Sequence, residues 1–137
     1  MALIGRLHPL LIHFPIALLI VAVAAEAVAT MTGRRRWRDI GLANARGGAL
    51  SALVAVAAGW LLASAPEMGT TAILEWHKWL GTTSALFAVT AALATSSGCS
   101  ESTHVRMYRI ALLGAGTLVA VAGHLGGLMV WGNVLRP

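Results

Sequence analysis

Long apolar stretches separated by short polar segments organise the whole chain. Four stretches have roughly the 20 apolar residues that cross a bilayer, and they cover about residues 9–31, 47–64, 72–96 and 105–131. Ala and Leu dominate these stretches, and no alternating strand pattern is present. Because a helix satisfies its own backbone hydrogen bonds in lipid, the pattern predicts an all-α protein with four transmembrane helices.

The connections between the stretches are short, and their length predicts the topology. Polar segments at 33–46, 65–71 and 97–105 join the four stretches. Connections this short make neighbouring helices antiparallel, so we expect an up-down-up-down four-helix bundle. The 137 residues leave room for a single domain, residues 1–137. Pro15 is expected to kink the first helix, because it cannot bond to the carbonyl of Leu11.

Composition and charge agree with a membrane protein. Hydrophobic residues make up 58% of the chain and charged residues 11%, whereas a soluble domain carries about 25% charged residues. The net charge of +5 is concentrated in the 33–46 segment and at Arg106 and Arg109. Basic loops stay cytoplasmic, so we expect a multi-pass protein of the bacterial inner membrane with periplasmic termini. The arginine run 34–36 could also bind anionic lipid, but no nucleic-acid binding is expected.

Four histidines lie near the predicted periplasmic side: His8, His13, His77 and His124. At a rise of about 1.5 Å per residue, His13 and His77 lie at one depth, and His124 lies deeper. His13 and His77 are therefore our first choice as axial ligands of a heme. His124 is the alternative ligand, or a hydrogen-bond partner of a propionate or quinone. The single cysteine, Cys99, excludes a covalent heme motif, which leaves heme b.

Other residues near the same side complete the expected site. Arg6 could pair with a heme propionate. Trp60 and Trp76 are most simply explained by an interfacial aromatic belt, but they could also wall a heme or quinone pocket. Small residues form a stripe on the last helix, where they favour close helix packing or contact with a flat ligand: Gly116, Ala120, Gly123 and Gly127.

One acid lies well inside a predicted span. Glu26 is on the cytoplasmic half of the first helix, and such residues are usually paired or functional. We consider two roles for it: pairing with an arginine of the 34–38 segment, or a proton route toward a quinone.

A faint internal repeat is visible at an offset of 64 residues. It aligns His13 with His77, and residues 58–60 with 122–124. Such a repeat predicts two parallel copies of a helical hairpin.

Two motifs carry a resemblance to a known family. Residues 8–19 read HPLLIHFPIALL, and residues 123–130 read GHLGGLMV. Together they resemble a widespread bacterial family of four-helix membrane proteins of unassigned function, over nearly the whole chain. The resemblance implies a redox neighbourhood, because related domains occur beside Rieske, cytochrome c or quinoprotein dehydrogenase domains. It marks His8, His13 and His124 as functional candidates, joined by His77.

The leading hypothesis is an electron-transfer subunit in the lipid bilayer that links a periplasmic redox protein, or a larger respiratory complex, to the quinone pool. A non-catalytic anchor or assembly subunit is one alternative, and a zinc or copper site made by the four histidines is another. No nucleophile–base pair, phosphate loop or carboxylate dyad is present, so a stand-alone enzyme is not expected. Association into a homo-oligomer stays open.

Overall fold

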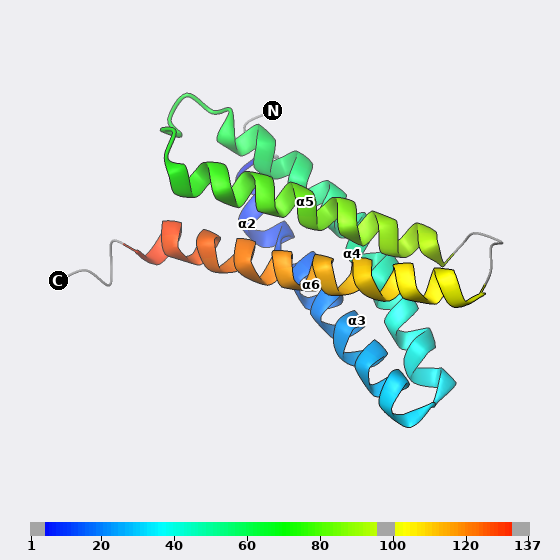
Figure 1. The fold of residues 1–137 in the computed structure, drawn as a ribbon. Coiled ribbons are helices and arrows are strands. Elements are labelled where there is room, and N and C mark those ends of the chain that lie inside the picture. The colour runs from blue at the N-terminus through cyan, green and yellow to red at the C-terminus, as the bar shows by residue number, and fades with distance from the viewer. Residues whose placement is uncertain (1–4, 96–100, 133–137) are drawn as a thin grey trace.

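The computed structural model describes residues 5–95 and 101–132, and every regular element within them is a helix (Figure 1). The elements are α2 (His8–Leu11), α3 (His13–Thr32), α4 (Arg35–Ala63), α5 (Ala72–Ala94) and α6 (Glu101–Trp131). Because α2 and α3 form one bent helix, the described residues form four long helical segments. The expected all-α bundle is therefore confirmed.

The first helical segment bends at Ile12, between α2 and α3. Pro15 lies one turn further along, and its ring nitrogen cannot donate to the carbonyl of Leu11. The kink expected from Pro15 is therefore present. The bend turns α2 onto α4, which it contacts, and this orientation determines which histidine faces inward.

Only Gly33 and Arg34 separate α3 from α4. Gly33 has φ of 67°, a left-handed conformation that glycine adopts without strain. Its N–H donates to the carbonyl of Ala29 at 2.9 Å and closes the helix end.

The expectation that 33–46 is a loop is wrong for most of its length, because α4 begins at Arg35. Polar residues occupy one face of this stretch, but Gly41 and Ala45 are buried on the other face. Packing against α3 therefore starts the helix about three turns before the apolar stretch at residues 47–64. In the same way, α6 begins at Glu101 rather than near residue 105.

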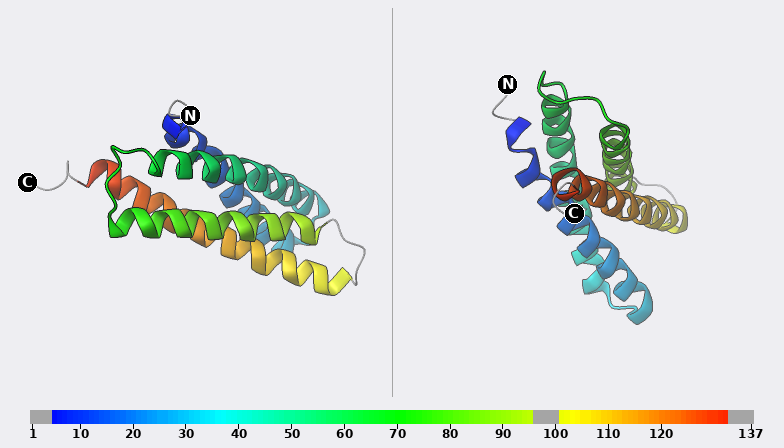
Figure 2. Two further views of the ribbon diagram at one scale, coloured as in Figure 1. Left: turned by 90° about the horizontal axis from the view of Figure 1, so that it is seen from above. Right: turned by 90° about the vertical axis from the view of Figure 1, so that its left-hand side faces the viewer.

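The helices form two hairpins, α3 with α4 and α5 with α6, which are joined through α4–α5 and α3–α6 contacts. The two hairpins cross at a wide angle, and the lower halves of α3 and α4 diverge from α5 and α6 (Figure 2). The start of α2, the connection between α4 and α5, and the last turn of α6 lie toward one end of the molecule (Figure 1). The turn between α3 and α4 lies at the other end.

Small residues form most of the core, with Leu19 and Leu112 as its largest fully buried side chains. A Cβ added at Gly48 would lie 2.8 Å from Leu19 Cδ2, so α3 and α4 approach closely there. Small residues allow this approach in lipid, where packing rather than water exclusion holds helices together.

The glycine stripe of α6 packs partly on α3. A Cβ at Gly116 would lie 2.8 Å from Val23, and one at Gly123 would lie 3.3 Å from Ile16. A Cβ at Gly127 would meet nothing within 4 Å, and Ala120 is exposed. Helix packing thus explains Gly116 and Gly123, while Gly127 faces open space.

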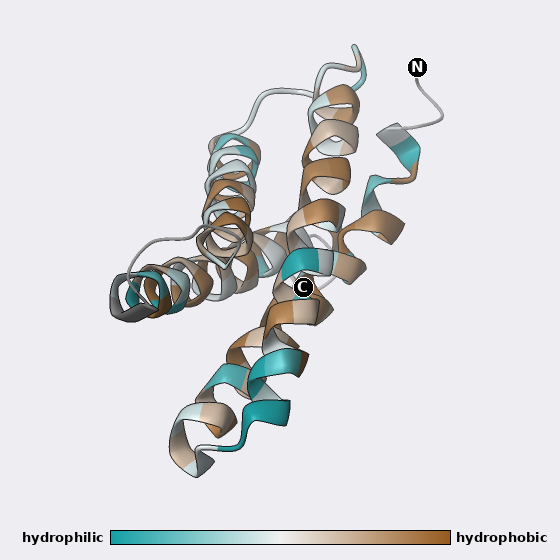
Figure 3. Cartoon of the chain, turned by 90° about the vertical axis from the view of Figure 1, so that its right-hand side faces the viewer, coloured by the Kyte–Doolittle hydropathy of each residue, from teal (hydrophilic) through white to brown (hydrophobic). Residues whose placement is uncertain are grey.

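Three of the described helices are long and apolar enough to cross a membrane: His8–Thr32, Arg35–Ala63 and Thr103–Trp131. The third predicted span, α5, is not among them. Its first half carries Glu75 and Lys78 and a polar run at 82–84, which lowers its mean hydropathy. Figure 3 shows a group of hydrophilic residues near the turn between α3 and α4, with smaller groups elsewhere on the helices.

Candidate functional site

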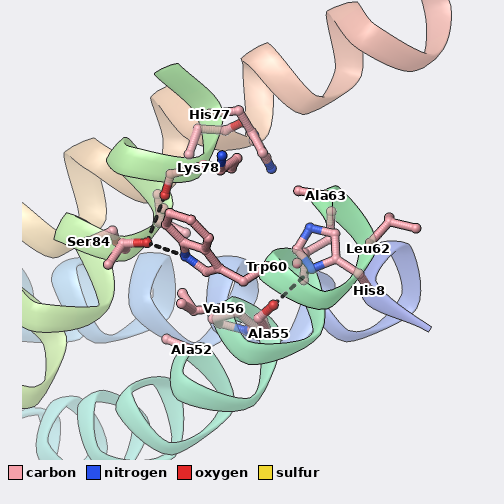
Figure 4. Close-up of a pocket in the computed structure, with 18 of the residues that line it drawn as sticks. His8, Ala52, Ala55, Val56, Trp60, Leu62, Ala63, His77, Lys78 and Ser84 are labelled. Atoms are coloured by element: carbon pink, nitrogen blue, oxygen red, sulfur yellow. Dashed lines mark hydrogen bonds between the residues drawn. The ribbon is translucent and has the colours of Figure 1, made fainter. Parts of the chain in front are cut away.

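A cavity of about 130 Å³ lies between α2, the start of α3, α4, α5 and α6 (Figure 4). Its walls are mainly apolar and include Ile12, Val56 and Met129. The two histidines that line it, His8 and His77, come from different hairpins. The cavity is therefore an apolar space with two imidazoles in its wall.

Each of these histidines is fixed by a backbone carbonyl of the neighbouring helix. Nδ1 of His8 lies 2.9 Å from the carbonyl oxygen of Ala55, and Nδ1 of His77 lies 2.8 Å from that of Ala122. A carbonyl only accepts, so Nδ1 donates in both rings. In the neutral ring this leaves the lone pair on Nε2, the state in which imidazole binds a metal.

The two rings point toward one another across the cavity (Figure 4). Their centroids are 6.1 Å apart, and their planes make an angle of 85°. A metal–nitrogen bond is about 2.0–2.1 Å, and a ring nitrogen lies about 1.1 Å from its ring centre, so two imidazoles on one metal have centres about 6.2–6.4 Å apart. The observed separation of 6.1 Å is close to this range.

Two glycines make room for the histidines. A Cβ at Gly59 would lie 2.8 Å from His8 Cε1, and a Cβ at Gly126 would lie 3.2 Å from His77 Cε1. Each glycine comes one turn after the residue whose carbonyl accepts the hydrogen bond. Each histidine therefore contacts one turn of the adjacent helix through the Cε1 edge of its ring.

The two halves of the site correspond to each other and reveal the repeat. The histidines are 69 residues apart, while the carbonyls and the glycines are 67 apart. Burial follows the same register: in α3 Leu19, Ala22 and Ala25 are buried, and in α5 Ala88, Ala91 and Ala94 are buried. The expected offset of 64 therefore has the wrong register, because Ala-rich helices align almost equally well at several offsets.

The outer wall is formed by Trp60 and its neighbours. Its Nε1 donates to Thr82 Oγ1 at 3.1 Å, and its ring packs edge-on against Trp79 at 5.5 Å. Nζ of Lys78 lies 4.5 Å from the Trp60 ring centre and donates to Glu75 at 2.8 Å. A cation is thus held at the edge of an otherwise apolar cavity.

The structure divides the expected site residues into two groups. His8, His77, Trp60 and Gly123 line the cavity. The remaining ones do not line it: His13, His124, Trp76 and Arg6 are exposed, and Gly127 faces open space.

The structure brings His77 together with His8, and not with His13. His8 and His13 are five residues apart, which turns them about 140° around a helix. Only one of them can face inward, and the bend at Ile12 selects His8. The estimate of depth along the helix selected His13 as a ligand, because such an estimate ignores the direction in which a side chain leaves the helix.

A metal site with three or more protein ligands is not formed in the part of the chain that the structure describes. No group of three His, Cys, Asp or Glu side chains gathers there. The geometry therefore gives no support to a zinc or copper site made by all four histidines.

Sequence reasoning missed the parts of the site that orient the histidines. The carbonyls of Ala55 and Ala122 carry no sequence signal, since every residue has one. Gly126 lies within the GHLGG segment, so its motif was visible, but its contact with His77 was not. Lys78 was not among the expected site residues.

Glu26 lies far from this cavity, on the lower part of α3, and is 6% exposed. Its carboxylate accepts from Arg109 at 2.8 Å and from Arg38 at 3.4 Å. The expected pairing with an arginine of the 34–38 segment is confirmed, and α6 adds a second arginine.

Comparison with known proteins agrees with these features. Residues 6–136 match a family described as predicted membrane proteins, DUF2231. No curated protein matches the chain, and no solved structure does. The match covers nearly the whole chain, as the resemblance of its two motifs implied, and the chain therefore belongs to this family of membrane proteins.

Proposed function

We propose that this protein is a membrane electron-transfer subunit that binds heme b between His8 and His77. The observation that carries the proposal is the imidazole pair, with ring centres 6.1 Å apart and both Nδ1 atoms donating to carbonyls. Hydrogen bonding of the second ring nitrogen is the usual way in which proteins orient a ligating histidine.

The surroundings favour heme over a bare ion. Only two protein ligands converge, whereas a structural zinc site uses four. A porphyrin supplies four further nitrogens and an apolar body that suits the walls at Ile12 and Val56. Iron held between two histidines has no open position and passes single electrons.

The cavity is smaller than a usual ligand pocket, so heme binding requires its outer wall to move. Ligand pockets usually measure about 300–1,000 Å³, and this cavity measures about 130 Å³. Gly81 lines the cavity, and a Cβ added there would meet no atom within 4 Å. Trp60, which is 38% exposed, is the side chain that moves outward.

The remaining residues orient and shield the group. Lys78 is the cation in the cavity wall and pairs with a propionate by exchanging its contact with Glu75. Trp60 and Trp79 separate the site from the membrane interface. With the basic end of the bundle in the cytoplasm, the site lies near the periplasmic side of the bacterial inner membrane, within reach of a periplasmic redox protein and the quinone pool.

Absorption spectra of the purified protein test the proposal. After expression with ample heme, we expect a Soret band and, on dithionite reduction, the sharp α band of low-spin heme b. His8→Ala and His77→Ala lose the low-spin spectrum. His13→Ala and His124→Ala, which change exposed histidines, keep it.

Two results would contradict the proposal. One is a wild-type protein without a Soret band after expression with ample heme; copurification with a partner would then favour a non-catalytic anchor subunit. The other is a heme spectrum that survives in both His8→Ala and His77→Ala.

A further inference from the structure

A buried carboxylate at the opposite end of the bundle holds two arginines from different helices. Glu26 Oε1 on α3 accepts from Arg109 Nε on α6 at 2.8 Å and from Arg38 NH2 on α4 at 3.4 Å. Arg109 also donates to Thr30 Oγ1 at 3.0 Å. Both guanidinium groups therefore converge on one oxygen and have a fixed position.

The cluster of Glu26, Arg38 and Arg109 has a net positive charge and N–H donors that are not used within it. One carboxylate faces two guanidinium groups, so one positive charge is left over. A guanidinium has five N–H donors, of which Arg38 uses one and Arg109 two for the bonds found among the described residues. Each of these two side chains is 37% exposed, so donors reach the surface of the bundle.

The position of the arginine pair restricts the partner. Arg38 is in the first turn of α4, just after the turn at Gly33 and Arg34. It therefore lies at one end of the candidate span Arg35–Ala63, where lipid head groups meet the helices. The phosphate oxygens of lipids are acceptors at this level, and arginine binds phosphate with two parallel hydrogen bonds.

We propose that Arg38 and Arg109 bind the phosphate of an anionic phospholipid, with Glu26 as the residue that positions them. Exposed arginines at 34–36 add general attraction to an anionic surface. The guanidinium groups fixed by Glu26 differ from these, because less side-chain entropy is lost when they bind. This site is independent of the heme proposal, since it lies at the other end of the bundle.

Lipid titration of the full chain in neutral detergent tests the proposal. Phosphatidylglycerol is expected to raise the midpoint of thermal unfolding, and native mass spectrometry should show retained lipid. Phosphatidylcholine at the same concentration should give a much smaller shift. Inorganic phosphate should give little stabilisation, and equal stabilisation by it would overturn the assignment to lipid.

Matched variants separate a site from diffuse attraction. Arg38→Gln leaves the 2.8 Å bond between Arg109 and Glu26 in place and should weaken phosphatidylglycerol binding at least about tenfold, which corresponds to about 1.4 kcal/mol. Arg35→Gln removes the same charge from an exposed arginine and should weaken binding less than twofold. Equal losses would overturn the proposal.

A conservative variant covers the case in which Arg38→Gln does not fold. Arg38→Lys keeps the charge but lacks the planar pair of donors. We expect weaker lipid binding with an unchanged unfolding midpoint in lipid-free detergent. Full lipid binding by Arg38→Lys would show that charge alone suffices and would overturn the phosphate site.

Discussion

Gly59→Ala should displace a proposed ligand while leaving the fold intact. The new Cβ on α4 would lie 2.8 Å from Cε1 and 3.1 Å from Nδ1 of His8. Carbon atoms in contact prefer about 3.5–4.0 Å, so the ring must retreat by roughly 1 Å. It cannot do so and keep its 2.9 Å hydrogen bond to the carbonyl of Ala55.

The cost to stability should be small, because two effects oppose each other. Loss of the His8 hydrogen bond costs about 0.5–1.5 kcal/mol. Alanine gains about 0.8–1.0 kcal/mol over glycine within a helix. The free energy of unfolding should therefore change by less than about 1 kcal/mol, while heme affinity falls at least about tenfold, or about 1.4 kcal/mol.

Heme titration of the apo-protein, followed at the Soret band, measures the affinity, and thermal unfolding measures the stability. Gly127→Ala is the control, because its Cβ on α6 meets nothing within 4 Å. It should bind heme as the wild type does and be slightly more stable. Unchanged affinity in Gly59→Ala, or equal losses in both variants, would refute this reasoning.

Three further substitutions test the site and the core. Gly126→Ala places its Cβ 3.2 Å from Cε1 of His77, so it should reduce heme affinity less than Gly59→Ala does; a larger loss would contradict the contact geometry. Gly48→Ala places its Cβ 2.8 Å from Leu19 and should destabilise by about 1–3 kcal/mol, as thermal or denaturant unfolding would show. Tyr108→Phe removes a buried hydroxyl that has no partner among the described residues, so stability should stay equal or rise by up to about 1 kcal/mol; a clear loss would show that the hydroxyl is bonded.

The helices could be predicted because membrane burial leaves a long apolar signal. The kink at Pro15 and the pairing of Glu26 could also be predicted, since each follows from one residue with a strong physical constraint. The start of α4 could not be predicted from the sequence. Its first turns are polar on one side, and only contact with α3 shows that Gly41 belongs to a buried helix face.

The histidine pair was harder to predict, because it depends on rotation about the helix axis as well as on depth. Counting residues gave His13 and His77 the same level, but the bend at Ile12 directs His8 toward His77. The atoms that fix the rings are backbone carbonyls, which no residue type marks. The correspondence between the two halves becomes visible only when these contacts are aligned, because Ala-rich helix sequences align almost equally well at several offsets.

Electron paramagnetic resonance of the oxidised, heme-loaded protein tests the central claim most directly, because the signal of low-spin ferric heme depends on the angle between the axial imidazoles. The 85° between His8 and His77 predicts the strongly anisotropic signal of perpendicular ligands, and both His8→Ala and His77→Ala should abolish it. A signal typical of parallel imidazoles, or one that persists in His8→Ala, would contradict the assignment of this pair.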